Sequence, residues 1–157
     1  MMKRLLYRVM AVLAACFASP WAAWHQRRIR RSGRQLNARE LAMAQALGLK
    51  RPGGIFICEV ERVPNPLFPV MKLARRCGVH WISNVAGITL GQGIYVTHES
   101  QPSPALIAHE LVHVWQYQQV GSIWRFMVEY VYQCLLVGYH DAEWEIEARK
   151  VSAKLIS

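Results

Sequence analysis

Hydrophobic positions are distributed differently before and after residue 34. The run from Val9 to Trp24 is apolar apart from Ser19, whereas the rest of the chain breaks into short apolar segments with regular periods. We therefore divide the chain into an N-terminal arm, residues 1–34, and a domain, residues 35–157.

The domain mixes segments with strand composition and segments with helical periodicity. We expect strands at residues 55–60, 79–82, 87–90 and 93–97, where β-branched and apolar residues dominate. A serine before a proline at Ser103-Pro104 and several terminal glycines indicate helix ends, so we expect helices at residues 36–49, 70–77, 104–120, 122–137 and 142–155. This pattern predicts an α+β fold, a small domain whose helices are segregated from a short sheet.

The predicted helix of residues 122–137 is apolar on nearly all sides. Because Arg125 and Glu129 interrupt it, we interpret it as a buried helix and not as a membrane span.

The sequence His109-Glu110-Leu111-Val112-His113 lies in the first turns of the helix that follows Ser103. Histidines four positions apart share one helix face, so both imidazoles can bind one metal ion. Glu110 can reach a water on that metal, and this H-E-x-x-H arrangement is typical of hydrolytic zinc sites. The alternative is a helix with two unrelated histidines and an exposed glutamate.

Zinc in hydrolytic sites usually has three protein ligands and a fourth position open to water. The third ligand is expected from another element, and the candidates are Glu143, Glu145 and Glu147 on the last helix. Three carboxylates in five residues are also typical of a solvated helix face. Helical geometry does not choose between Glu145 and Glu147.

The chemistry of such a site gives Glu110 the role of base, which accepts a proton as the zinc water attacks a carbonyl. A second electrophile often assists, and four side chains are available: Tyr95, Tyr117, Tyr139 and His140. The strand of residues 93–97 could pair with an extended peptide substrate. The alternative for that strand is an ordinary sheet edge.

The net charge of +9 belongs to the arm. Residues 1–34 contain eight basic and no acidic residues, whereas the remainder contains eleven basic and ten acidic residues. A nearly neutral domain argues against a nucleic-acid-binding fold, so we expect no specific nucleic-acid partner. The four cysteines form no C-x-x-C pair, which favours buried free thiols over a disulfide framework or a cysteine zinc site.

The arm indicates membrane association. Its apolar run is short for a spanning helix, which needs about 20 residues. Leu13-Ala14-Ala15-Cys16 resembles a lipoprotein cleavage box, which would give an exported form. The arginines directly after the run favour the cytoplasmic side and contact with anionic lipid. The alternative is a disordered basic tail.

The stretch from His109 to Gln116, together with Glu145-Ile146-Glu147-Ala148, resembles the gluzincin group of zinc metallopeptidases. Within that group the chain is most similar to short bacterial H-E-x-x-H domains, including the peptidase-like domain linked to contractile injection systems. Residues 87–91 and 93–96 look like the segment that precedes the motif in those proteins. The resemblance covers about Leu36 to Ala153 and implies a zincin-like domain with an edge strand above the metal.

The resemblance also implies a ligand set for Zn²⁺: His109, His113 and Glu145, with Glu110 as the catalytic residue. Relatives with an E-x-E-A pattern use the glutamate three residues before the alanine, which is Glu145 here. Thermolysin-like enzymes use a glutamate directly before an alanine, which would be Glu147.

Three hypotheses for function follow. The first is a zinc metallopeptidase or peptidase-like hydrolase that acts on a peptide or protein substrate near a membrane. The second is a non-catalytic zinc-binding module with an interaction or secretion-associated role. A short chain leaves little room for a deep cleft, and the acidic or amide residue usual four positions after the ligand is replaced by Arg149. The third is a protein that acts through its arginine arm, with the motif incidental.

Overall fold

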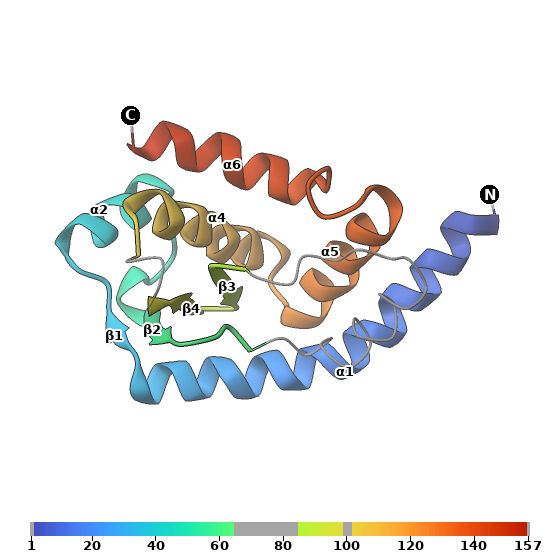
Figure 1. The fold of residues 1–157 in the computed structure, drawn as a ribbon, viewed down its shortest axis with the longest axis horizontal. Coiled ribbons are helices and arrows are strands. Elements are labelled where there is room, and N and C mark those ends of the chain that lie inside the picture. The colour runs from blue at the N-terminus through green and yellow to red at the C-terminus, as the bar shows by residue number, and fades with distance from the viewer. Residues whose placement is uncertain (1, 65–84, 99–101, 157) are drawn as a thin grey trace.

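A four-stranded mixed sheet lies between a long N-terminal helix and the helix that carries His109 and His113, which we call the motif helix (Figure 1). The computed structural model describes residues 2–64, 85–98 and 102–156. The strands are β1 (Arg34–Gln35), β2 (Phe56–Val60), β3 (Gly87–Leu90) and β4 (Gly93–Thr97), in the order β1-β2-β4-β3. The pair β2–β4 is parallel, and the pairs β1–β2 and β3–β4 are antiparallel.

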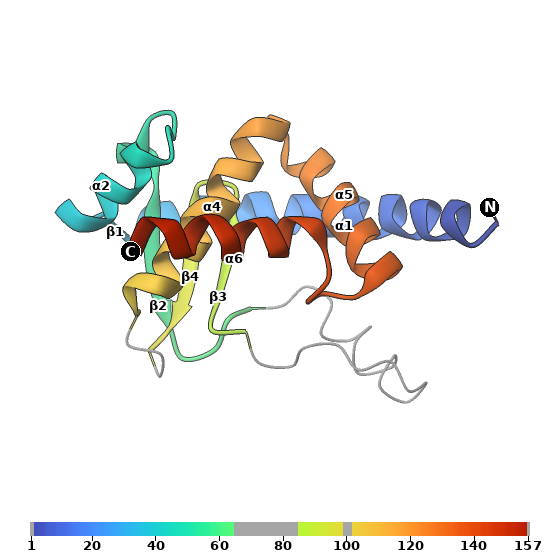
Figure 2. The same cartoon turned by 90° about the horizontal axis from the view of Figure 1, so that it is seen from above.

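The helices lie on both sides of this sheet. They are α1 (Met2–Ser32), α2 (Ala38–Ala46), α4 (Pro104–Val120), α5 (Ile123–Val137) and α6 (Glu143–Ile156). Seen from above, α6 crosses over α4, and α1 runs on the far side of the sheet (Figure 2). The predicted α+β class is therefore confirmed.

Alternating residues of the central strands face two separate cores. Ile57 of β2 and both Ile94 and Val96 of β4 pack with α2 and α4. Tyr95 of β4 and Cys58 of β2 face the other way, toward α1 and α5. Successive strand residues point to opposite faces of a sheet, so covering both faces explains why these strands are largely apolar.

The predicted ends of the motif helix agree with the structure. The Ser103 side chain accepts a hydrogen bond from the Leu106 amide, Pro104 occupies the first turn, and Gly121 ends the helix at φ +75°. Ser122 caps α5 in the same way by accepting from the Arg125 amide. These caps set where α4 begins, and hence which turns carry the histidines.

The turn between β3 and β4 is formed by Gly91 and Gln92, as expected, with Gly91 at φ +67°. Strand β4, however, lies inside the sheet between β2 and β3. Its backbone groups are already paired on both sides, so the expectation that residues 93–97 pair with a substrate is wrong. Among the described residues, β1 and β3 are the edge strands.

Within the predicted arm, residues 2–32 form one helix and Arg34 begins β1. Helix α1 is long and apolar enough to cross a membrane by length and composition, and about a fifth of its apolar window is buried. The expected thiol burial holds for Cys134 but not for Cys16, which is exposed; Cys58 is half-buried, and Cys77 lies outside the described residues. The expected helix at residues 70–77 and strand at residues 79–82 lie outside the described residues.

Gly33 joins α1 to β1 at a point of close backbone approach. A Cβ atom there would lie 2.7 Å from the carbonyl oxygens of both Ile29 and Ile57. We predict that Gly33→Ala lowers stability by about 1–3 kcal/mol, because backbone atoms cannot move aside as a side chain can. In thermal denaturation this corresponds to a Tm lower by roughly 3–10 °C. The matched control is Gly53→Ala, where a Cβ meets nothing within 4 Å, and equal Tm values for the two variants would contradict the prediction.

Candidate metal centre

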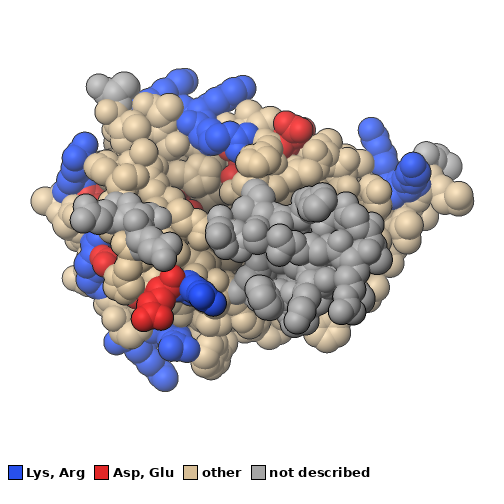
Figure 3. All heavy atoms as spheres, viewed as in Figure 1, with Lys and Arg blue, Asp and Glu red and all other residues tan. Residues whose placement is uncertain are grey.

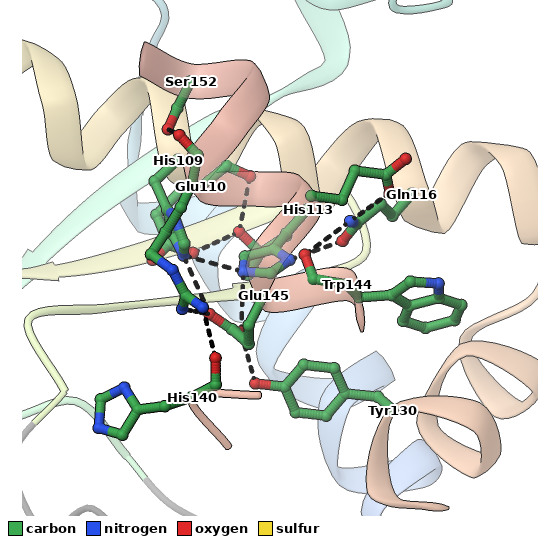
Figure 4. A network of polar contacts seen from close by, with 12 residues as sticks. His109, Glu110, His113, Gln116, Tyr130, His140, Trp144, Glu145 and Ser152 are labelled. Carbon is green, nitrogen blue, oxygen red and sulfur yellow. Dashed lines mark hydrogen bonds and ion pairs between the residues drawn. The ribbon is translucent and has the colours of Figure 1, made fainter. Parts of the chain in front are cut away.

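Three side chains from two helices converge on one point between α4 and α6 (Figure 4). The Nε2 atoms of His109 and His113 lie 3.1 Å apart. Glu145 places Oε1 3.2 Å from the His113 Nε2 atom and Oε2 3.4 Å from the His109 Nε2 atom. The structure thus brings together the two motif histidines and the glutamate that the resemblance implies.

The separations between these atoms fit a tetrahedral cation. Ligand atoms about 2.0–2.1 Å from a tetrahedral zinc ion lie about 3.3–3.4 Å from one another. The three measured separations fall close to that value, and the two that involve Glu145 start at different oxygens of its carboxylate. Two imidazole nitrogens and one carboxylate oxygen also form the donor set of one class of hydrolytic zinc sites. A His-His-Glu cluster of this kind could hold a metal ion.

Glu145 is buried as a charged group. Its side chain is 1% exposed, and the Tyr130 hydroxyl donates to Oε1 at 2.8 Å. Oε2 is buried without a hydrogen-bond partner among the described residues. Burial alone would raise the pKa of Glu145, but the close imidazoles of His109 and His113 hold that pKa well below its usual range. An ionised carboxylate whose Oε2 atom has only ion-pair contacts, to His109 at 3.4 Å and to Arg149 at 3.9 Å, favours binding of a cation.

A second set of contacts orients His113. The Gln116 side chain lies on the same face of α4, and its Oε1 atom is 2.8 Å from the His113 Nδ1 atom. The Gln116 amide nitrogen donates to Glu147 Oε2 at 2.8 Å and to the Trp144 carbonyl at 3.0 Å. Because Gln116 offers an acceptor to Nδ1, it favours the tautomer whose Nε2 atom is free to bind a metal.

Glu147 therefore supports the metal centre indirectly, and its carboxylate does not point at the cluster of His109, His113 and Glu145. It fixes Gln116, which in turn fixes His113, whereas Glu145 approaches the imidazoles directly. The buried stripe of α6 consists of Glu145, Ala148 and Ser152, so Glu145 belongs to the buried face of this helix. Glu143 is exposed.

Glu110 is turned toward the edge strand β3. The Thr89 hydroxyl lies 2.7 Å from Glu110 Oε2 and 3.0 Å from the Glu110 carbonyl oxygen. A Cβ atom at Gly87 would lie 2.7 Å from Glu110 Oε1, so the carboxyl group needs a glycine there. Burial raises the pKa of Glu110, and the positive charge of His113 and His109 only partly offsets this effect.

The four side chains proposed as second electrophiles are dispersed. Tyr95 contacts His25 at 3.0 Å beneath α1, and Tyr117 stacks on Phe126. The His140 imidazole extends away from the cluster (Figure 4). Tyr139 lies near enough to Glu145 to be affected by its charge. Burial, and then this charge, raise the pKa of Tyr139.

Sequence reasoning missed three residues of the centre: Thr89, Gln116 and Tyr130. A signal existed for Gln116, because a residue three positions after His113 shares its helix face. No sequence pattern pointed to Tyr130, which reaches the site only through the packing of α5 beside α6.

Arg149 occupies the position where an acidic or amide residue was expected after Glu145. Its Nη1 atom lies 3.9 Å from Glu145 Oε2, and its guanidinium donates to the His140 carbonyl. The side chain is 45% exposed. It places a positive charge at the solvent side of the cluster.

Part of the chain matches a known family model. A family model described as the eCIS core domain, of the extracellular contractile injection system, matches residues 82–121. This match spans β3, β4 and the motif helix and is consistent with an injection-system-linked protein; it is not a match to a peptidase family. No curated protein and no solved structure matches the chain.

Substitutions on α6 separate the roles of its three glutamates. We predict that Glu145→Ala binds no zinc, because the cluster loses a direct ligand. Glu147→Ala should keep one zinc per chain with roughly tenfold weaker affinity, the lower end of the effect of removing an outer partner. The exposed Glu143→Ala is the matched control and should bind like the parent. Metal analysis after dialysis against zinc is the measurement, and loss of metal from Glu147→Ala but not Glu145→Ala would contradict this assignment.

Proposed function

We propose that the protein is a zinc-dependent hydrolase of the metallopeptidase type, with His109, His113 and Glu145 as ligands. The observation that supports this most directly is the pair of imidazole Nε2 atoms 3.1 Å apart, each of which lies 3.2–3.4 Å from a carboxylate oxygen of Glu145. The choice of zinc follows from two imidazoles and a carboxylate in a compact arrangement, since calcium and magnesium prefer oxygen ligands.

A zinc ion bound there would lower the pKa of a coordinated water to about 7 and polarise a substrate carbonyl. Glu110 would accept the proton from the attacking water and pass it to the leaving amine. Burial raises the pKa of Glu110, which suits a group that must take up a proton and release it again.

Tyr130 and Arg149 are the side chains best placed to assist. The Tyr130 hydroxyl contacts Glu145 at 2.8 Å, and burial followed by the charge of Glu145 raises its pKa well above the usual value. It therefore remains a hydrogen-bond donor at neutral pH. Arg149 offers a permanent charge to a developing oxyanion or a substrate carboxylate.

A second candidate is a non-catalytic zinc-binding module linked to an injection system. The eCIS core domain match supports it. So does the limited access to the cluster, where the side chains of His109, His113 and Glu145 are 19%, 9% and 1% exposed. In this role the metal would join α4 to α6, and the outer surface of the domain would be available to bind a protein partner.

The two candidates differ in what Glu110 does. We predict that Glu110→Gln keeps one zinc per chain and lowers peptide hydrolysis at least a hundredfold, because an amide cannot accept the proton. The measurement is zinc content alongside cleavage of a peptide library.

The control for this experiment is the exposed Glu143→Gln, which should cleave like the parent. If parent and Glu110→Gln cleave equally well, Glu110 is not the base. If the zinc-loaded parent cleaves nothing in the library, the non-catalytic module is favoured.

Both candidates require the metal to stabilise the fold, because it binds two helices that are far apart in the sequence. We predict that a chelator lowers the Tm of the zinc-loaded parent by roughly 5–10 °C, as expected for about 100-fold saturation of the site. Glu145→Ala should melt at the same temperature with and without chelator. A parent whose Tm does not respond to chelation would contradict a metal between α4 and α6.

A further inference from the structure

Helix α1 exposes its large apolar side chains and buries mostly small ones, the reverse of what is usual for a helix that covers a core in water. Its buried positions are mostly small and recur every three or four residues: Ala11, Ala15, Ala18, Ala22, His25 and Ile29. Its exposed positions include the large apolar side chains Met2, Leu5, Leu6, Val9, Met10, Leu13, Phe17 and Trp24. A helix that covers a core in water usually shows the reverse arrangement.

The outward face of α1 changes character along its length. From Met2 to Trp24, about 33 Å of helix, the sector opposite the buried alanines carries no charge. Arg27 and Arg31 continue the same sector in the last two turns, and both are exposed. In Figure 3 the visible lower edge, along which α1 runs, is tan, with a blue patch at its left end.

Arg8, a charged residue of the first turns, lies on the inward flank instead. Arg8 forms a 2.8 Å ion pair with Glu129 of α5 and lies over the Tyr132 ring. Its charge is thus turned away from the apolar sector. Trp24, at the junction between apolar and cationic parts, lies beside the Arg28 guanidinium, 5.7 Å from ring centre to carbon.

We propose that this outward face of α1, which we call the α1 ridge, lies flat on an anionic lipid bilayer. We define it by Leu6, Leu13, Phe17, Trp24 and the arginines 27 and 31. The apolar part would enter the boundary between head groups and acyl chains, and the arginines would contact lipid phosphates. Tryptophan at the junction is typical of a membrane interface. This inference goes beyond the metal chemistry and does not depend on it.

The packing of α1 favours an in-plane helix over a spanning one. Its inner face is occupied by the sheet and by α5, through contacts such as His25 with Tyr95 and Arg8 with Glu129. A spanning α1 would draw this ion pair and the polar groups of the sheet into hydrocarbon, which is costly. Lying flat buries only the ridge. The metal centre is then directed away from the bilayer, because it lies between α4 and α6 on the opposite side of the sheet (Figure 1).

Vesicle flotation of the full chain tests the proposal. The protein is mixed with vesicles of phosphatidylcholine alone or of phosphatidylcholine with phosphatidylglycerol, at low and high salt. We expect binding to the anionic vesicles that weakens with salt, because the electrostatic part is screened. Leu13→Gln/Phe17→Gln should lose binding to the anionic vesicles at low and at high salt. Arg27→Gln/Arg31→Gln should bind the anionic vesicles about thirtyfold more weakly.

Matched controls carry the same changes away from the ridge. Ile156→Gln alters an exposed apolar residue of α6, and Arg39→Gln/Lys150→Gln removes two exposed charges from α2 and α6. Both should bind vesicles like the parent, and circular dichroism should show unchanged helix content in every variant.

Two results would overturn the proposal. In the first, the parent stays unbound with anionic vesicles, or Leu13→Gln/Phe17→Gln binds as well as the parent. In the second, sedimentation shows a parent dimer that Leu13→Gln/Phe17→Gln converts to a monomer, with no affinity of the parent for lipid. The ridge would then be covered by a second copy of the chain.

Discussion

The architecture around the candidate metal centre depends on the docking of α6 against α4. The two ligands on α4 come from one stretch of helix, but the third comes from a helix about thirty residues later. Gln116 holds this junction by donating to both Glu147 and the Trp144 carbonyl. The same side chain sets the orientation of His113, so helix docking and ligand geometry depend on one buried amide.

The buried charge of Glu145 explains why the contact between α4 and α6 favours binding of a cation. Glu145 is buried and ionised, and one of its oxygens has no hydrogen bond among the described residues. Burying a carboxylate costs several kcal/mol unless a positive charge or a metal compensates it. The Nε2 atoms of the two imidazoles can share at most one hydrogen bond with each other, whereas both can bind one divalent ion. A bound cation would satisfy all three groups at once.

The sequence predicted much of this arrangement, because the relevant signals are local. Caps at Ser103 and Gly121 and the spacing of His109 and His113 follow from helix geometry, and the β3–β4 turn follows from its glycines. Helix geometry left Glu145 and Glu147 equivalent, and the resemblance favoured Glu145. The structure shows what distinguishes them: the rotation of α6, set by its packing on α4 and α5.

Features that depend on contacts between residues far apart in the sequence could not be predicted from local sequence patterns. The position of β4 inside the sheet depends on its parallel pairing with β2, which is separated from it by more than thirty residues. The contribution of Tyr130 depends on how α5 packs beside α6, and the role of Gly87 depends on a carboxyl group from another element. The apolar arm was visible in the sequence, but its small buried face and large exposed face appear only once the sheet and α5 are in place.

X-ray absorption spectroscopy at the zinc edge of the zinc-loaded protein identifies the atoms bound to the metal. We expect four nitrogen or oxygen neighbours at about 2.0–2.1 Å, with the outer-shell signal of two imidazoles and no sulfur. A zinc shell that contains sulfur, six oxygen neighbours without imidazole, or one imidazole only would contradict a site formed by His109, His113 and Glu145.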